Sequence, residues 1–200
     1  ADEKKYSKET GEVYYIYKRK YLNLTFVFCL NSNKELKKLT IRGSIHKLFN
    51  NGLHNANKFS FKDLENTLKT FSDTFGIDLK KCVLYPFEYG NNLYLQDFCK
   101  FDAGEIVLNT FCENRKIFNP NVAGLDSSII SGTYNSEYRL KMYVKSDEFP
   151  QYCLETLRVE TQQKKMRDLN KKGINVVTDL FIVKNQRTLY EKHIDNLKQI

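Results

Sequence analysis

Residues 137–160, EYRLKMYVKSDEFPQYCLETLRVE, place one tyrosine among several cationic side chains. Tyr143 follows Arg139 and Lys141 at intervals of two residues, and Lys145 comes two residues later. A tyrosine phenolate can attack a DNA phosphate and hold the cut end covalently. Nearby cations favour that reaction, because they stabilise the phenolate and the charge of the transition state. The spacing therefore indicates phosphodiester chemistry with Tyr143 as the candidate nucleophile.

The elements that would position these groups are two strands of a hairpin. One face of the first strand is predicted to carry Tyr138, Leu140, Met142 and Val144. The other face is predicted to carry Arg139, Lys141, Tyr143 and Lys145. After a turn-rich patch the alternation resumes, with Arg158, Glu160 and Gln162 on the polar face of a second strand. The polar faces of both strands should therefore lie together.

Glu160 and Glu88 are the candidate metal ligands. Glu160 belongs to the second strand of the hairpin, and Glu88 joins it if the strand around PFEYG lies alongside. Carboxylate oxygens favour Mg²⁺ or Mn²⁺ over Zn²⁺. The histidines, His46, His54 and His193, are more often structural or solvated than metal ligands, although His46 and His54 flank a loop that could approach a phosphate.

Two further segments have the composition of nucleic-acid contacts. The basic run Lys164, Lys165, Arg167, Lys171 and Lys172 could follow a DNA backbone. Tyrosines 14, 15, 17 and 21, beside Lys18, Arg19 and Lys20, could stack on unpaired bases. The simpler alternative for the basic groups is that they solvate exposed strand and helix faces, and strand packing is the simpler explanation for at least half of the tyrosines.

Composition bounds the class of protein. The chain has 200 residues and a net charge of +8, which suggests one domain with an anionic partner, most often nucleic acid. Five cysteines without CxxC spacing favour a reduced, cytoplasmic protein and exclude a zinc finger. No apolar run is long enough for a membrane helix, and the N-terminus has no apolar signal segment. Because the chain lacks an initiator Met and ends abruptly, we expect it to be part of a longer protein.

Local patterns predict the order of elements. Residues 13–30 read as one or two strands with a hairpin across Lys18–Lys20, and residues 39–45 as another strand. Ser60 and Gly76 bound a helix, and residues 81–89 read as a strand followed by a loop at Gly90–Asn92. Short elements are expected at 96–101 and 105–112, before the hairpin. The segment KKMRDLNKKG either ends the second hairpin strand or begins a short helix, with Gly173 as a stop, and a final helix capped by Thr178 would follow. This order predicts an α+β fold, a central antiparallel sheet of about five strands with helices mainly on one side.

The motifs YRLKMYVKS and LRVETQQKKMRDL resemble a pair found in replication initiators of phages and plasmids that replicate by a rolling circle. The similar group comprises the Rep_trans-like and filamentous-phage-like initiators. The segments TIRGSIHKLFNNG and FEYGNN also resemble conserved segments of these proteins. The resemblance covers most of residues 39–180. The chain lacks the pair of histidines, one residue apart, with which many rolling-circle nucleases hold their metal ion. It also departs at Val144, where the pattern usually has Asp or Asn.

The resemblance implies a metal-dependent endonuclease that nicks DNA at an origin, keeps the 5′ phosphate on tyrosine and leaves a 3′ hydroxyl. Tyr143 would be the nucleophile, with Tyr138 and Tyr134 as alternatives. Lys145 and Arg158 would stabilise the negative charge of the phosphate, and Glu88 and Glu160 would hold Mg²⁺ or Mn²⁺. DNA contacts are expected from Arg139, Lys141, Lys164, Lys165 and Arg167.

The implied partners are origin DNA, single-stranded or in a hairpin, and a host helicase and polymerase, in the cytoplasm of a bacterial or phage-infected cell. No membrane partner is expected. Two alternatives stay open. One is a binding module of the same fold that no longer cuts, and the other is a viral structural or interaction protein.

Overall fold

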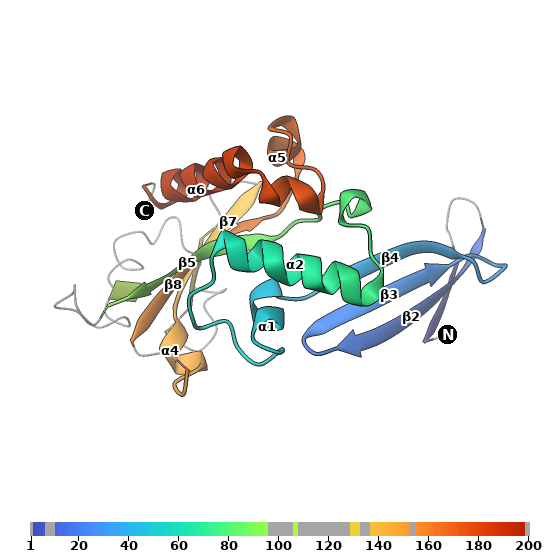
Figure 1. The fold of residues 1–200 in the computed structure, drawn as a ribbon, viewed down its shortest axis with the longest axis horizontal. Helices are drawn as coiled ribbons and strands as arrows, with labels where there is room; N and C mark the ends of the chain where they lie inside the picture. The colour runs from blue at the N-terminus through green and yellow to red at the C-terminus, as the bar shows by residue number, and fades with distance from the viewer. Residues whose placement is uncertain are drawn as a thin grey trace. The chain divides into compact units, whose positions relative to one another are not determined.

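The computed structural model describes residues 2–6, 11–95, 106–107, 129–132, 137–152 and 155–198. The chain divides into two compact units, Ala1–Asn55 and Ala56–Ile200. Each unit contains a four-stranded antiparallel sheet. Figure 1 draws β2, β3 and β4 of the first sheet and β5, β7 and β8 of the second as arrows. The predicted α+β class is therefore confirmed, with the antiparallel strands distributed over two sheets.

The N-terminal unit is a meander of four strands. These are β1 (Glu3–Tyr6), β2 (Val13–Tyr21), β3 (Leu24–Leu30) and β4 (Leu36–Arg42), paired in chain order. The turn between β2 and β3 lies at Leu22 and Asn23, so the hairpin predicted across Lys18–Lys20 is wrong. The β-branched and aromatic residues of this segment continue one strand through its lysines. The short helix α1 (Ile45–Phe49) follows β4, with Ser44 as its N-cap.

The helix predicted between Ser60 and Gly76 is confirmed as α2 (Phe61–Phe75). Ser60 and Asp63 form a reciprocal capping box, in which the Ser60 side chain accepts from the Asp63 N–H. Gly76 ends the helix in the left-handed conformation, with φ of 63°. The 3-10 turn η1 (Leu79–Lys81) follows.

The second sheet has the strand order β5-β8-β7-β6. Its strands are β5 (Glu88–Tyr94), β6 (Ile129–Gly132), β7 (Tyr138–Val144) and β8 (Thr156–Gln163). The strand predicted at 81–89 begins only at Glu88, after Pro86, which cannot donate to a ladder. The loop expected at Gly90–Asn92 is wrong, because these residues pair with β8.

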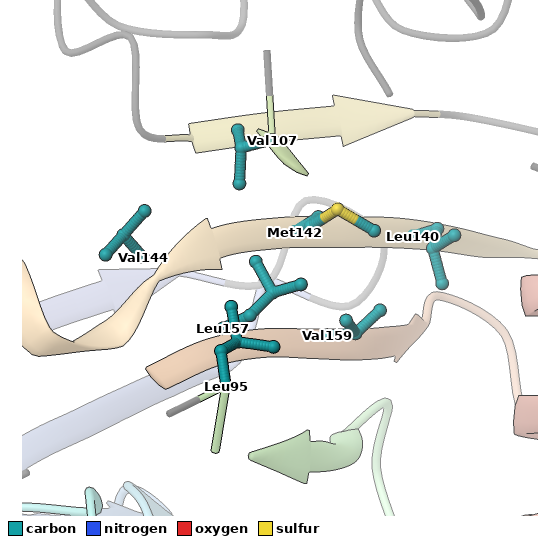
Figure 2. Packing of buried hydrophobic residues seen from close by; sticks show 7 residues of the cluster. All are labelled: Leu95, Val107, Leu140, Met142, Val144, Leu157 and Val159. Atoms are coloured by element: carbon teal, nitrogen blue, oxygen red, sulfur yellow. The ribbon is translucent and has the colours of Figure 1, made fainter. Parts of the chain in front are cut away.

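The alternation predicted for the hairpin is confirmed in β7, where buried and half-buried residues alternate along the whole strand. The buried residues pack into a hydrophobic cluster with β8, seen in Figure 2, whose members are Leu95, Val107, Leu140, Met142, Val144, Leu157 and Val159. Leu197 of the C-terminal helix packs against this cluster. Burying this side of the sheet commits the alternate residues of both strands to the opposite face.

The C-terminal segment forms α5 (Arg167–Lys171), the 3-10 turn η2 (Val177–Phe181) and α6 (Val183–Leu197). The short helix that Gly173 was expected to stop is confirmed, and Gly173 has φ of 84°. Thr178 does not cap the last helix, because it lies inside η2 and α6 begins at Val183. A second cluster of buried residues joins these elements: Leu169, Ile174, Leu180 and Leu189.

Some predictions concern residues outside the described part of the chain. They include the alternative nucleophile Tyr134, the helix near 96–101, and most of the element at 105–112.

Between the hairpin strands, residues 145–148 form a single helical turn, α4 (Lys145–Glu148). None of the described helices has the length and apolar character needed to span a bilayer.

Candidate active site

The register of the second sheet brings the predicted site residues onto one face. Tyr143 is directly opposite Arg158, Lys141 is opposite Glu160, and Arg139 is opposite Gln162. On the other side of β8, the partners of these residues are Asn92, Gly90 and Glu88 in turn. We call these nine residues the polar face: Glu88, Gly90, Asn92, Arg139, Lys141, Tyr143, Arg158, Glu160 and Gln162.

Arg158 lies at the centre of a hydrogen-bonded group beside the candidate nucleophile. Its Nε lies 2.6 Å from Oε1 of Glu160, and its Nη1 donates to Oδ1 of Asn92 at 2.9 Å. The side chains of Arg158 and Glu160 are only 12% and 8% exposed. Because both charges are largely withdrawn from water, each depends on the other for its stabilisation. The guanidinium is thus fixed next to Tyr143.

The second carboxylate of the polar face, Glu88, is also paired with a cation. Nζ of Lys141 lies 2.6 Å from Oε1 of Glu88, and Nε2 of Gln162 donates to the same oxygen at 2.6 Å. The strand of Glu88 therefore lies beside β8, as the sequence-based metal hypothesis requires. Gly90 lies between the two carboxylate positions and adds no side chain.

Gly90 permits an unusually close approach of β5 to β8. A Cβ atom at this position would lie 2.0 Å from the carbonyl oxygen of Val159 and 2.7 Å from Cα of Glu160. No side chain can occupy that space without movement of the backbone. Sequence reasoning took Gly90 as a loop signal, whereas in the structure it keeps the ladder beside Glu160 intact.

Tyr143 is half-buried, and its pKa is raised well above the usual value for a tyrosine. Burial is the main cause, and the Glu160 carboxylate adds to it, while the Arg158 guanidinium opposes it. The phenol is therefore protonated at neutral pH. A nucleophilic role requires a base or an additional cation when the substrate binds.

Lys145 does not share the face predicted for it with Arg139, Lys141 and Tyr143, because the strand ends at Val144 and Lys145 begins α4. Its side chain is 1% exposed, and Nζ lies 2.5 Å from Oε2 of Glu148. The ammonium also lies 5.4 Å from the centre of the Tyr143 ring and 4.6 Å from that of Phe149. Burial lowers the pKa of Lys145, against the opposing effect of Glu148. Lys145 is therefore buried rather than exposed on the polar face, and its ammonium lies against the Tyr143 ring.

Val144, where the sequence departs from the initiator pattern, does not belong to the polar face. Its side chain is buried in the cluster of Figure 2, and the residue is the N-cap of α4, without a side-chain capping bond. Asp and Asn, which the pattern usually has here, are favoured N-cap residues. Val144 is therefore a helix cap and a core contact in this chain, and it contributes no group to the polar face.

The alternative nucleophile Tyr138 lies on the core side of β7 and is 6% exposed. Tyr138 therefore lies on the opposite side of β7 from Arg139, Lys141 and Tyr143, and Tyr143 is the tyrosine of the polar face. The predicted DNA contacts Lys164, Lys165 and Arg167 follow the end of β8, where Glu137 forms ion pairs with Lys165 and Arg167. The pKa of Lys164 is lowered, mainly by burial and further by the Arg139 charge.

The donor set suits Mg²⁺ or Mn²⁺ in its chemistry. Glu88 and Glu160 offer carboxylate oxygens from adjacent strands, and magnesium is commonly held by one or two carboxylates with water and substrate phosphate completing its shell. Within the part of the chain that the structure describes, no three histidine, cysteine, aspartate or glutamate side chains gather into a metal-binding group. A divalent ion would have to compete with Lys141 and Arg158 for these carboxylates.

Sequence reasoning placed Gln162 on the polar face but did not single out Asn92 or Glu148, and all three orient the predicted residues by hydrogen bonds and ion pairs. For Asn92 the signal was the same alternation, on the neighbouring strand β5, whereas no alternation identifies Glu148 in the helical turn α4. Comparison with protein-family models, with curated proteins and with solved structures finds no match for this chain.

Proposed function

We propose that this protein nicks one strand of DNA at a replication origin and holds the cut end on Tyr143, initiating rolling-circle replication. The observation that carries the proposal is the cross-strand pairing of Tyr143 with Arg158 on a face that also bears Glu160. These residues were selected from the sequence by the chemistry of phosphodiester attack. A fold that scattered them would have argued against that chemistry.

In the proposed reaction, Oη of Tyr143 attacks phosphorus and the bond to the 3′ oxygen breaks. The phenol loses its proton, the leaving 3′ oxygen gains one, and the products are a 5′-phosphotyrosine and a 3′ hydroxyl. The reverse attack by a 3′ hydroxyl rejoins a strand, because the phosphotyrosine keeps the energy of the diester. Arg158 stabilises the negative charge on the phosphorane. The buried ammonium of Lys145, next to the Tyr143 ring, adds to this stabilisation.

A divalent ion, Mg²⁺ or Mn²⁺, would be held by Glu88 and Glu160. When bound it would withdraw charge from the phosphate oxygens and favour the phenolate of Tyr143. The raised pKa of the phenol supports this requirement, since the polar face alone does not ionise it. Glu88→Gln and Glu160→Gln should each raise the concentration of Mn²⁺ that nicking requires, because each removes one carboxylate ligand.

The test is covalent capture. The protein is incubated with a pool of short single-stranded DNA and Mn²⁺, and a denaturing gel is examined for protein bound to DNA. We expect an adduct that disappears with a chelator and with Tyr143→Phe. Tyr152→Phe is the matched control, because Tyr152 is exposed, lies after α4 and is outside the polar face. An adduct that persists in Tyr143→Phe would remove Tyr143 from the mechanism.

A second candidate function is a binding module that recognises an origin or a single strand without cutting. The observation that favours it is that both carboxylates of the polar face are neutralised, Glu88 by Lys141 and Glu160 by Arg158. Salt-dependent DNA binding without an adduct on any origin sequence would support this candidate. In either case the expected partners are DNA and the host helicase and polymerase, in the cytoplasm of a bacterial or phage-infected cell.

A further inference from the structure

Most of the net positive charge of the chain lies in the N-terminal unit. Residues 1–55 contain eleven lysines and arginines against five acidic residues, so this unit carries +6 of the total +8. The unit with the polar face carries the remaining +2. An anionic partner is therefore attracted chiefly to the unit that does not contain the candidate nucleophile.

The strand register divides this sheet into two different faces. Tyr15, Tyr17 and Tyr21 of β2 are directly opposite Leu30, Phe28 and Leu24 of β3, so these side chains share one face. Lys18, Lys20, Lys38 and Arg42 lie on the other face. We call these the aromatic face and the cationic face.

The aromatic face contains a shallow groove of about 350 Å³. Its lining residues are Tyr17, Arg19, Phe28, Leu30, Lys34 and Leu36, from three adjacent segments of the sheet. Tyr17 and Phe28 are cross-strand partners, and the guanidinium of Arg19 lies 6.0 Å from the centre of the Tyr17 ring. Aromatic rings thus share the groove with two cations.

Such a groove suits a single nucleic-acid strand better than an apolar partner. Unpaired bases stack on aromatic side chains, and arginine and lysine contact the phosphates that follow each base. A duplex has its bases stacked inside and offers none to Tyr17 or Phe28. An apolar partner would gain nothing from Arg19 and Lys34 at the same site. The acidic group nearest to Arg19 is Asp2, whose Oδ2 lies 3.4 Å from Nη1.

We propose that the groove of the aromatic face binds single-stranded DNA, with bases stacked on Tyr17 and Phe28 and phosphates contacted by Arg19 and Lys34. That the strand is DNA rests on the proposed nicking function, whereas the preference for unpaired bases rests on the groove itself. The N-terminal unit would then retain a strand independently of the covalent bond to Tyr143.

The experiment measures the affinity of the full chain for a labelled 20-mer of thymidine by fluorescence anisotropy, with a chelator present to prevent nicking. Arg19→Glu with Lys34→Glu reverses the two cations of the groove. Lys20→Glu with Lys38→Glu is the matched control, because it changes the net charge equally on the cationic face. We expect the dissociation constant to rise at least about tenfold more in the groove variant than in the control.

Tyr17→Leu tests stacking without a change of charge. It should raise the dissociation constant about fivefold to tenfold and leave the slope of log Kd against log salt unchanged, since no phosphate contact is lost. Thermal unfolding of each variant shows whether the fold is kept, and Arg19→Gln provides a milder substitution if the reversal prevents folding.

Equal losses in the groove and control variants would overturn the proposal, and so would equal affinity for a single strand and for a duplex of the same length. Failure of the nicking function gives a different result. In that case no covalent adduct forms with Mn²⁺, while the groove variants still lose affinity for the single strand.

Discussion

Tyr143 on β7 and Arg158 on β8 are directly opposed residues of one antiparallel pair, and the guanidinium of Arg158 is held by groups other than Tyr143. Glu160 lies 2.6 Å from its Nε, and Asn92 accepts from its Nη1. A phosphate that reaches the phenol would therefore meet a cation whose position is already fixed. This preorganisation also links the stability of the sheet to the chemistry of the site.

The Arg158–Glu160 pair should behave as a buried ion pair. Arg158→Met leaves the Glu160 carboxylate without its cation, and should lower the free energy of unfolding by about 3–5 kcal/mol. Adding Glu160→Leu removes the isolated charge, so the double variant should recover at least half of that loss. Urea unfolding of the three proteins measures the effect. The exposed pair of Lys69 and Glu65 on α2 is the control, where Lys69→Ala should cost less than about 1 kcal/mol. Additive losses at positions 158 and 160 would contradict the coupling.

Gly90→Ala should destabilise the second sheet, because the new Cβ would overlap the carbonyl oxygen of Val159. We expect a loss of about 1–3 kcal/mol, measured by urea unfolding, together with weaker covalent capture as β5 moves away from Glu160. Asn91→Ala, at the exposed neighbouring position of β5, should change stability by less than about 0.5 kcal/mol. If the free energy of unfolding of Gly90→Ala equals that of the wild type, β5 can move away from β8 without a loss of stability, which would contradict this prediction.

The sequence predicted the hairpin well, because a long period-two alternation with one buried face determines which residues share a side. The register follows from the same constraint, so Arg158 and Tyr143 could be assigned to one face before the structure was known. The pairing of Glu88 with β8 was expected only as a condition, since nothing in a single sequence states which strands are neighbours.

Errors arose where tertiary contacts override local preference. Gly90 and the asparagines after it have turn composition, yet pairing with β8 keeps them extended. Lys145 fits the alternation, but the chain turns into α4 and buries its ammonium between aromatic rings. Burial of a lysine depends on partners such as Glu148 and Phe149 that no periodicity identifies.

His193 should make the protein sensitive to acid. It is 2% exposed on α6, its Nδ1 lies 2.9 Å from Oγ1 of Thr161, and burial lowers its pKa, against the opposing effect of the Glu160 charge. The unfolded chain therefore takes up a proton on His193 at a higher pH than the folded one. Stability that is complete above about pH 6.5 should fall as the pH drops below that value.

The check on His193 is urea unfolding between pH 5 and 7.5 in wild type and in His193→Leu. The variant loses the hydrogen bond to Thr161 and should be less stable at pH 7.5, but the loss between pH 6.5 and 5 should be smaller than in the wild type. The same acid loss in both proteins would assign it to other groups.

Lys145 separates a role in the reaction from a role in DNA binding. Its ammonium is withdrawn from solvent and lies between Glu148 and the rings of Tyr143 and Phe149. Lys145→Met keeps a long apolar side chain at this position and removes only the charge. The rate of covalent capture at saturating DNA should fall about 100-fold, as when one stabilising donor is removed from a transition state. The dissociation constant for DNA should change little, because the ammonium is not exposed.

Lys165→Ala is the matched variant for the same measurement. Lys165 is 47% exposed beyond the end of β8, so its loss should weaken DNA binding and reduce the slope of log Kd against log salt by about one. Its rate of capture at saturating DNA should stay at the wild-type value. If Lys145→Met instead captures DNA at the wild-type rate, the buried lysine only stabilises the start of α4, and Arg158 is left to stabilise the phosphate without it.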